Sequence, residues 1–482
     1  MCDRSELCVG GSVCDETQRK CVCAAGHRVR RDSCVLNGNS SAIGEECAGT
    51  AGGKCEGGAE CRDQRCACAA GETNEDGYCT KLERRRFSTY RPPTPATFAD
   101  RCPLPEQPTR CQLPDCFCSR NGREPPPGIP LEELPQIVVL TFDDPVNDKS
   151  MRDYRHLFQD FRLVNPNGCP IKATFFVSHE WTNYDAVQWI AEQGHELASN
   201  SISHRVLSGA NWTEWLAEMD GQRQIMAKFA NVKEAEIVGM RAPQLGLGGD
   251  VQFLMARSSG FLYDNTISAD PGIDGAPYWP HTLDFAVPYR CENDYCPRVS
   301  IPGMWALPMN VFHGATEFLR SPMLQGMLVG NETADHVLYF LFRNFNRAYT
   351  QNRAPYILNL NAEFLQSHGG VGMRALENNV FTHLPVGCSF LGLMTQYPDV
   401  YFLTMREVVE WMRAPQSVDQ LAQKGRCPQF TYAAPSAAPT CRQPNKCMYQ
   451  TPGLGSKEHQ FLTCNRCPMT YPWTNNPMGA TF

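Results

Sequence analysis

Short apolar segments alternate with amphipathic segments from residue 136 to residue 412. Residues 136–142, 172–177 and 356–360 are apolar and rich in β-branched side chains, as is typical of buried strands. Segments such as 184–193 and 336–349 carry apolar side chains at helical spacing. Strands that alternate with helices form parallel βαβ units. About seven such units over about 280 residues predict an α/β fold, a distorted (β/α) barrel rather than an open sheet, with chemistry at the C-terminal ends of the strands.

The composition is that of a globular protein and argues against two classes of partner. Of the 482 residues, 42% are hydrophobic and 20% are charged. The formal net charge is −7, the wrong sign for contact with nucleic acid or an anionic membrane surface. No run of about 18 apolar residues occurs, so no membrane span is expected. A neutral polymer, a small molecule or a protein partner is compatible with this balance.

Twenty-five cysteines are present, and many of them lie in a repeated pattern near the N-terminus. One copy contains Cys2, Cys8, Cys14, Cys21, Cys23 and Cys34, and the other contains Cys47, Cys55, Cys61, Cys66, Cys68 and Cys79. We expect modules at 1–36 and 44–80, each with three disulfides of open pairing and each similar to EGF-like or EB-type repeats. Zinc is the less favoured alternative because paired C-x-x-C knuckles are lacking.

Disulfide-rich modules persist in oxidising compartments, which predicts a secreted, extracellular protein. Sequons at Asn39, Asn211 and Asn331 predict a glycoprotein. The chain starts with Met1-Cys2 and no leader segment, which we interpret as a mature form or a fragment.

The positions of proline and cysteine residues predict the linker and the C-terminal extension. Residues 81–101 begin with a basic run, continue into a Pro-rich stretch and are expected to form a semi-rigid linker. The barrel is expected over 102–415, where Cys291 and Cys296 are close enough in sequence to pair. A C-terminal extension over 416–482 is expected to be stapled by disulfides. Its cysteines are Cys427, Cys441, Cys447, Cys464 and Cys467.

A pair of aspartates, Asp143 and Asp144, ends the first barrel strand in the sequence Thr-Phe-Asp-Asp-Pro-Val-Asn over 141–147. Two adjacent carboxylates at a strand end point in different directions, so one can hold a metal while the other accepts a proton. The alternative is a pair of loop aspartates that cap the following helix.

Several segments, in this order, resemble the motifs of the polysaccharide deacetylases, which are carbohydrate esterase family four with its NodB-homology domain. These segments are T-F-D-D-x-x-N at 141–147, K-A-T-F-F-V at 172–177, G-H-E-L at 194–197, R-A-P at 241–243, F-L-Y-D at 261–264 with Y-W-P at 278–280, and N-R-A-P at 352–355. The resemblance covers about 135–415, extends to the C-x-C at 116–118 and to the Cys-rich tail, and is strongest to the chitin deacetylases of invertebrate animals.

The resemblance implies a role for each of these positions. Asp143 would be the general base, steadied by Arg241, and Asp144 would be a metal ligand. Two His of an H-x-x-x-H motif would complete a site for a metal, usually zinc, and a His after a late strand would protonate the leaving amine. The candidate substrate contacts are Pro243, Tyr263, Asp264, Trp279 and Trp305; the two tryptophans could instead be packed in the core.

The sequence departs from the family at two of these positions. Asn200 replaces the first metal His, four residues before His204, and Asn361 aligns with the catalytic His. No His lies between His336 and His368, and His368 is a weak substitute in a Gly-rich loop. His195 is the other candidate ligand, although a structural role is favoured. Zinc is therefore expected to be bound weakly or not at all.

Three functions follow from this reading. The first is a catalytically impaired deacetylase homologue that binds chitin or another N-acetylglucosamine polysaccharide in an extracellular matrix. The second is an active zinc-dependent chitin deacetylase that releases acetate. The third is a non-enzymatic adaptor whose N-terminal modules bind matrix proteins. Neither a nucleic-acid partner nor a membrane span is expected.

Overall fold

The computed structural model describes residues 111–480 with several gaps, and short segments between residues 13 and 81. The gaps are 161–162, 294, 315–318, 331, 378–388, 424–426, 428–438 and 452–457. The chain divides into two compact units, Met1–Pro92 and Pro93–Phe482. The linker expected at 81–101 lies outside the described residues, apart from Lys81.

The N-terminal unit repeats a pair of small hairpins. Its strands are β1 (Val13–Asp15), β2 (Lys20–Val22), β3 (His27–Arg30), β4 (Ser33–Leu36), β5 (Ser40–Ser41), β6 (Lys54–Cys55), β7 (Glu60–Arg62), β8 (Arg65–Ala67), β9 (Glu72–Glu75) and β10 (Tyr78–Lys81). Hairpins β1–β2 and β3–β4 of one copy correspond to β7–β8 and β9–β10 of the other. A disulfide joins Cys55 to Cys66 within the second copy, and Cys61 and Cys68 are also in disulfides. The other predicted bridges lie outside the described side chains.

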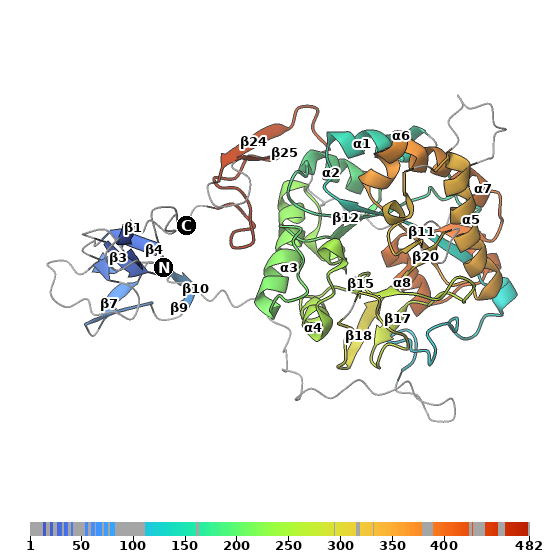
Figure 1. The fold of residues 1–482 in the computed structure, drawn as a ribbon, viewed down its shortest axis with the longest axis horizontal. Coiled ribbons are helices and arrows are strands. Elements are labelled where there is room, and N and C mark those ends of the chain that lie inside the picture. The colour runs from blue at the N-terminus through green and yellow to red at the C-terminus, as the bar shows by residue number, and fades with distance from the viewer. Residues whose placement is uncertain are drawn as a thin grey trace. The chain divides into compact units, whose positions relative to one another are not determined.

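The second unit is built on a nine-stranded sheet in which all strands but one are parallel (Figure 1). Its strands are β11 (Gln136–Asp144), β12 (Thr174–Val177), β13 (Glu196–Ser199), β14 (Gly239–Met240), β15 (Tyr263–Asp264), β17 (His281–Leu283), β18 (Ile301–Ala306), β22 (Tyr356–Leu360) and β23 (Val400–Phe402). The order is β17-β18-β15-β14-β13-β12-β11-β22, and β23 also pairs with β11. Among the described residues this ladder does not pair back on itself, so the barrel is incomplete. The predicted distorted (β/α) barrel is confirmed.

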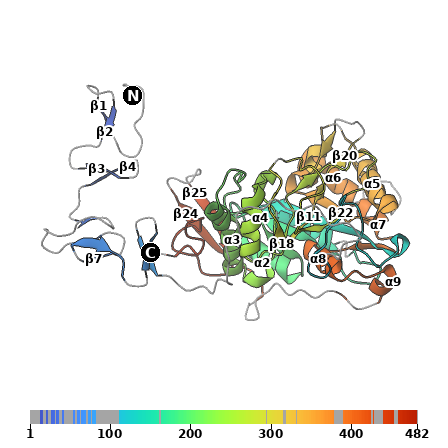
Figure 2. The same ribbon diagram turned by 90° about the horizontal axis from the view of Figure 1, so that it is seen from below.

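Helices cover the outside of the curved sheet (Figures 1 and 2). They are α1 (Asp148–Arg155), α2 (Tyr184–Glu192), α3 (Trp212–Phe229), α4 (Gly249–Ser258), α5 (Ala334–Gln351), α6 (Ala362–Leu376), α7 (Phe390–Met394), α8 (Met405–Arg413) and α9 (Val418–Leu421). Short strands β16 (Ser268–Ala269), β19 (Met309–Asn310), β20 (Phe312–His313) and β21 (Arg320–Ser321) follow the ends of β15 and β18. No helix in the described part of the chain combines the length and apolar character that a membrane span needs.

The central strand β11 separates two hydrophobic clusters because successive side chains of a strand point to opposite faces. Val138, Leu140 and Phe142 pack in the large cluster beneath the outer helices. Ile137 and Val139 pack in a second cluster. By the same alternation, Thr141 and Asp143 share the face of Ile137 and Val139, which puts Asp143 at the C-terminal end of the inner face.

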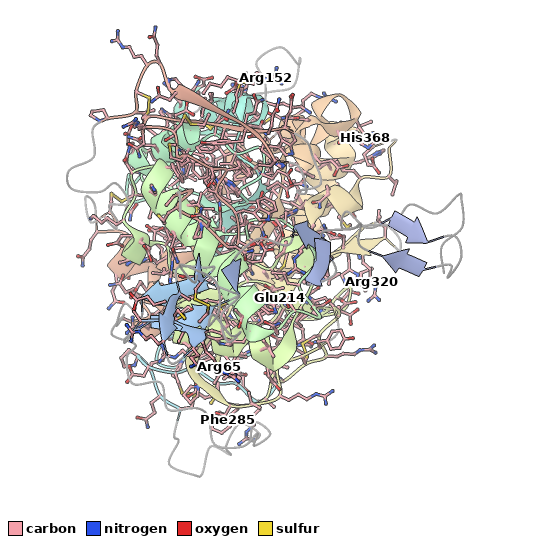
Figure 3. All side chains as sticks on the ribbon, turned by 90° about the vertical axis from the view of Figure 1, so that its left-hand side faces the viewer. Arg65, Arg152, Glu214, Phe285, Arg320 and His368 are labelled. Carbon is pink, nitrogen blue, oxygen red and sulfur yellow. A yellow bond between two sulfur atoms is a disulfide. The ribbon has the colours of Figure 1, made fainter. Side chains whose placement is uncertain are left out.

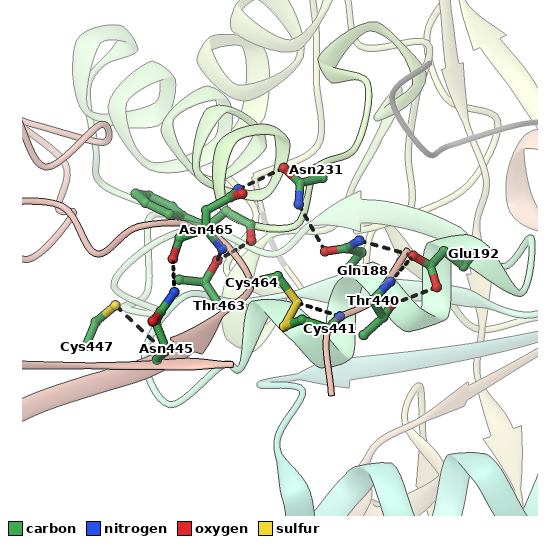
Figure 4. The surroundings of a disulfide bond; sticks show 11 residues. Gln188, Glu192, Asn231, Thr440, Cys441, Asn445, Cys447, Thr463, Cys464 and Asn465 are labelled. Carbon is green, nitrogen blue, oxygen red and sulfur yellow. Dashed lines mark hydrogen bonds between the residues drawn. A yellow bond between two sulfur atoms is a disulfide. The ribbon is translucent and has the colours of Figure 1, made fainter. Parts of the chain in front are cut away.

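A hairpin made of β24 (Asn445–Gln450) and β25 (Glu458–Thr463) packs against α2. Disulfides Cys441–Cys464 and Cys447–Cys467 hold it, and Cys169–Cys427 ties the preceding segment to the barrel. Thr440 donates to the Glu192 carboxylate at the end of α2, and Asn465 donates to Asn231 just after α3, so the residues that flank the hairpin are anchored near the ends of these helices (Figure 4). The expected disulfide between Cys291 and Cys296 is also confirmed.

Candidate active site at the C-terminal ends of the strands

The turn after β11 separates the two aspartates. Asp143 still follows the strand's alternation, whereas Asp144 has a left-handed backbone with φ 82°, which turns its side chain away from that alternation. Asn147 caps α1, with its side chain accepting from the N–H groups of Lys149 and Ser150. The alternative that the aspartates serve as helix caps is therefore wrong, because Asn147 does this and leaves both carboxylates available.

Arg241 holds Asp143 in a fully buried polar network. It follows β14 and its guanidinium donates to the Asp143 carboxylate, to Thr141 Oγ1 at 3.0 Å and to Asn359 Oδ1 at 2.8 Å. Its Nε donates to Asn265 Oδ1 at 3.1 Å. The guanidinium also lies 4.1 Å from the ring centre of Phe176. These contacts fix the Asp143 carboxylate in one orientation.

Burial raises the pKa of Asp143 to about 7, although the Arg241 charge acts in the opposite direction. Burial likewise lowers the pKa of Arg241, and Asp143 opposes that shift. A carboxylate with a pKa near neutral pH is suited to accept a proton. The structure therefore brings together the expected base and the arginine expected to steady it.

Asn265 and Asn359, the two asparagine partners of Arg241, were not singled out from the sequence. Asn265 directly follows β15, and Asn359 lies on β22 two residues before Asn361, which places both near the C-terminal ends of strands. Asn265 Nδ2 donates to the Leu307 carbonyl at 2.6 Å, and Asn359 Nδ2 donates to the Pro322 carbonyl at 2.9 Å. The only feature of the sequence that could have indicated them is their position near the ends of strands, and many structural residues share that position.

Asp144 meets two of the other expected site residues. His204 Nε2 lies 3.3 Å from Asp144 Oδ1, and Asn361 Nδ2 donates to Asp144 Oδ2 at 3.3 Å. The side chains of Asp144 and His204 are about one third exposed, at 32% and 30%. This half of the site is open to solvent, whereas the Asp143–Arg241 half is enclosed.

Asn200 is fixed by the backbone. It directly follows β13 and is buried, and its Nδ2 donates to the Arg241 carbonyl at 2.9 Å. Its Oδ1 is buried without a hydrogen-bond partner. The three positions where the family resemblance implies metal ligands therefore carry one carboxylate, one imidazole and one neutral amide.

This donor set does not fit the three-ligand zinc site that the family resemblance implies. Zinc is held by imidazole, thiolate and carboxylate ligands, and a neutral amide is a poor substitute. Within the described residues, no group of three or more His, Cys, Asp or Glu side chains is placed to hold a metal ion.

Asn361 begins α6. Its side-chain Oδ1 accepts from the Phe364 N–H at 3.0 Å, which is the standard N-cap interaction. The amide is thus engaged on both sides, by the helix through oxygen and by Asp144 through nitrogen. An amide at this position stabilises the helix start but has no proton to transfer at neutral pH.

The five expected substrate contacts are enclosed, and their role in substrate binding stays a prediction. Tyr263, Asp264, Trp279 and Trp305 are at most 1% exposed, and Pro243 is buried. Tyr263, Asp264 and Trp305 are buried on strands β15 and β18, whereas Pro243 and Trp279 are buried in connecting segments.

The buried polar atoms of three of these residues have internal partners. Tyr263 OH donates to Glu196 at 2.7 Å, and Trp279 Nε1 donates to the Asn352 carbonyl at 3.2 Å. Asp264 accepts from the Thr266 N–H at 2.8 Å, and burial raises its pKa to about 6. Each of these buried polar groups therefore has a hydrogen-bond partner inside the protein.

Neither alternative histidine lies in the site. His195 precedes β13, at the opposite end of that strand from Asn200, and its Nδ1 accepts from the Ala173 N–H. Burial, with a smaller effect of the Lys172 charge, lowers the pKa of His195 to about 3. His368 is exposed at a break inside α6, where Ser367, His368, Gly369 and Gly370 leave the helical conformation (Figure 3).

Comparisons with known proteins agree with the fold and the motifs. The profile of the polysaccharide deacetylase family matches residues 132–258. The chain is 36% identical to chitin deacetylase 1 of Bombyx mori over 382 residues, 77% of this chain and 68% of the relative. It is 32% identical to chitin deacetylase 8 of the same organism over 379 residues, 77% of this chain and 92% of the relative.

A solved structure is similar at lower identity. The chitin deacetylase of Colletotrichum lindemuthianum matches with a TM-score of 0.30 and 13% identity, over 57% of this chain and 88% of the other. The sequence relatives, the family profile and the strand-end arrangement of Asp143, Asp144 and Arg241 lead to one assignment. The chain belongs to the polysaccharide deacetylase family.

Proposed function

We propose that this chain is a secreted chitin-binding member of the family in which deacetylation is severely impaired. The observation that carries the proposal is the engagement of Asn200 and Asn361. Both amides stand where the family resemblance implies imidazoles. Asn200 is held by a hydrogen bond to the Arg241 carbonyl, and Asn361 is held by a hydrogen bond from the start of α6.

Two losses act on the same reaction. In the family, a bound zinc ion lowers the pKa of water and polarises the acetamide carbonyl. The residues around Asp144 do not fit such an ion. An amide at 361 cannot protonate a leaving amine, and general acid catalysis is typically worth roughly 10²–10⁴ in rate.

What remains is a site suited to recognising neutral polar groups. Asp144 and His204 present a carboxylate and an imidazole at one open edge of the barrel, next to the enclosed Asp143. Hydroxyl and acetamide groups of an N-acetylglucosamine chain can bond to such groups. The two Bombyx mori relatives are chitin deacetylases, which favours chitin as the polymer.

An active zinc-dependent chitin deacetylase is the second candidate. Two contacts favour it: the expected base Asp143 contacts Arg241, and the expected ligand Asp144 contacts His204. This candidate requires the Asn200 Oδ1, which has no other partner, to serve as a third ligand.

Extracellular localisation is supported by the disulfides of the described residues, which persist in oxidising compartments. A matrix role follows if the polymer is chitin. The N-terminal modules would then be available to bind matrix proteins.

The test combines three measurements on the purified, full-length protein. Zinc is determined by elemental analysis after dialysis, acetate release is measured with N-acetylglucosamine oligomers, and binding is measured by calorimetry with the same oligomers. We expect well under one zinc per chain, little or no acetate, and measurable binding. Asp143→Asn is the control, because acetate that persists in this variant does not come from this site.

Each alternative has its own outcome. Stoichiometric zinc with acetate release that Asp143→Asn removes would establish the active enzyme and refute the impaired one. Absence of both glycan binding and acetate release would leave the protein adaptor as the remaining function.

A further inference from the structure

A groove lies beside the candidate site, on the loop that follows β12. Asp144 and Val177 are neighbours in the pairing of β11 with β12. The loop after Val177 is tied to the loop that carries Asp144, because Val146 N donates to Thr182 Oγ1 at 3.1 Å and Asn183 N donates to the Val146 carbonyl at 2.7 Å. The groove therefore shares the rim of the barrel with the site.

Trp181 stands at the edge of this groove in an unusual conformation. Its φ is 68°, which is rare for a bulky residue, and its side chain is 48% exposed. The turn is enforced by Thr182, whose N–H donates to the His179 carbonyl and whose Oγ1 donates to the Ser178 carbonyl at 2.6 Å. A strained backbone that presents a large aromatic ring to solvent is a feature associated with ligand contact.

The opposite wall is the C-terminal hairpin. Leu462 N donates to Asn183 Oδ1 at 3.2 Å, and the buried His459 lies 3.5 Å from the Glu180 carboxylate. His459 also packs on the Tyr471 ring, with centroids 4.6 Å apart. The hairpin is thus fixed to the loop on either side of Trp181.

The groove between them has a volume of about 310 Å³. Its walls are formed by Trp181, Met448, Tyr449, Gln450, His459 and Gln460, with the Glu458 carboxylate among the lining groups. This volume is at the lower end of the range of small-molecule sites, about 300–1,000 Å³.

The lining selects a neutral polymer over a polyanion. No Lys or Arg is among the described residues that line the groove, and Glu458 disfavours anionic groups. An exposed indole offers an apolar face with a polar edge, suited to the C–H face of a pyranose ring. The amides of Gln450 and Gln460 can both donate to and accept from hydroxyl and acetamide groups.

We infer that this groove is an accessory glycan subsite, which binds sugar units of a chitin-type chain that extends from the Asp143–Asp144 site. The inference rests on the proposed function, because it requires that the chain binds this polymer. It assigns a binding role to the hairpin β24–β25, which lies outside the barrel and outside the segment 132–258 that matches the family.

The test compares dissociation constants of the N-acetylglucosamine dimer and hexamer, measured by calorimetry on the full-length protein. Trp181→Ala is expected to weaken hexamer binding about 3- to 10-fold and to leave dimer binding nearly unchanged. Trp181→Phe, which retains a ring, is expected to restore most of the hexamer affinity. Tyr339→Ala is the matched control, because Tyr339 is an aromatic residue on α5 that is 65% exposed.

The outcomes separate this inference from the function on which it rests. If wild-type protein prefers the hexamer and Trp181→Ala binds both oligomers as the wild type does, the subsite is refuted and chitin binding stands. An equal loss for dimer and hexamer also refutes it, since it indicates damage to the main site. If wild-type protein binds neither oligomer, the proposed function and the subsite both fail. A thermal unfolding curve for each variant confirms that it is folded.

Discussion

Asn200 and Asn361 each make hydrogen bonds that an imidazole would make differently. Asn200 donates to the backbone carbonyl of Arg241, and Asn361 accepts a hydrogen bond from the Phe364 N–H in the first turn of α6. Both residues therefore contribute to local structure at positions where the family resemblance implies chemistry. Asp144 and His204 still lie together at the open edge of the site.

Replacing Asn200 tests whether the metal half of the site can be rebuilt. Asn200→His should raise zinc affinity sharply, because imidazole replaces a neutral amide at the position where the family resemblance implies a third ligand with Asp144 and His204. The zinc dissociation constant is measured by titrating zinc into the protein in a calorimeter. His204→Ala added to this variant is the control and should remove the gain. Unchanged zinc affinity would mean that position 200 does not face the same space as His204.

Replacing Asn361 as well tests the proton-donor half. The variant Asn200→His/Asn361→His should release acetate from oligomers roughly 10²–10⁴ times faster than Asn200→His alone. Asn361→His alone should have little effect, since an acid has little to do without an activated nucleophile, so the two changes are non-additive. A double variant that binds zinc and releases no acetate would show that the pocket differs at further positions.

His195 predicts a pH dependence of stability. Burial lowers its pKa to about 3, below the unfolded value near 6.5, so the unfolded state binds more protons between these values. The contribution of neutral His195 is complete above pH 6.5 and is lost as pH falls toward 3. At pH 5 the expected loss is about 2 kcal/mol.

His195→Asn removes this titration while keeping an acceptor for the Ala173 N–H. Denaturant unfolding at pH 7 and pH 5 should show a smaller loss for this variant than for the wild type. The exposed His336 supplies the control, since His336→Gln should leave the difference unchanged. If the free energy of unfolding falls equally in His195→Asn and in the wild type between pH 7 and pH 5, the titration of His195 is not the cause of the loss.

The hairpin β24–β25 is an element whose stability depends on cross-links more than on a core of its own. A disulfide that closes a loop of about 20 residues contributes roughly 3 kcal/mol. Replacing Cys447 and Cys467 with alanine should therefore speed amide exchange in 445–450 and 458–463 and leave β11 protected.

Hydrogen–deuterium exchange read by mass spectrometry measures this difference. Replacing Cys291 and Cys296, which close a short loop elsewhere, is the control and should not affect the hairpin. Exchange that rises equally in β11 and in the hairpin would show that the hairpin is part of one cooperative unit with the barrel.

At the scale of the whole molecule, the two units have separate internal structure. The hydrophobic clusters of the described residues lie within the second unit. A chain shortened to residues 93–482 should therefore unfold at the same midpoint as the barrel in the full chain. Circular dichroism on heating measures the midpoint, and calorimetry measures hexamer affinity, which should also be unchanged.

Two results would contradict this prediction. An aggregated or much less stable short chain would show that the N-terminal unit supports the barrel. A folded short chain with weaker hexamer binding would move part of the glycan contact to the N-terminal modules.

The sequence by itself determined the type and order of the barrel elements and predicted which residues stand at the ends of the strands. Apolar runs and helical spacing are local properties, so 136–142 and 356–360 could be read as strands without knowing their neighbours. Parallel strands place their C-terminal ends at one edge, which brought Asp143, Asp144, Arg241 and Asn361 together in the prediction. The disulfides of the tail were also expected, because clustered cysteines in a secreted chain are seldom ligands.

The tertiary structure alone decided which side chains face the site and which lie beneath it. Asn359 bonds Arg241 across 118 residues, and Trp181 meets a hairpin that begins more than 250 residues later. The same packing encloses Tyr263, Trp279 and Trp305, whose residue types fit a sugar platform equally well. A local pattern encodes the period and the end of an element, whereas burial and long-range partners depend on how distant elements pack together.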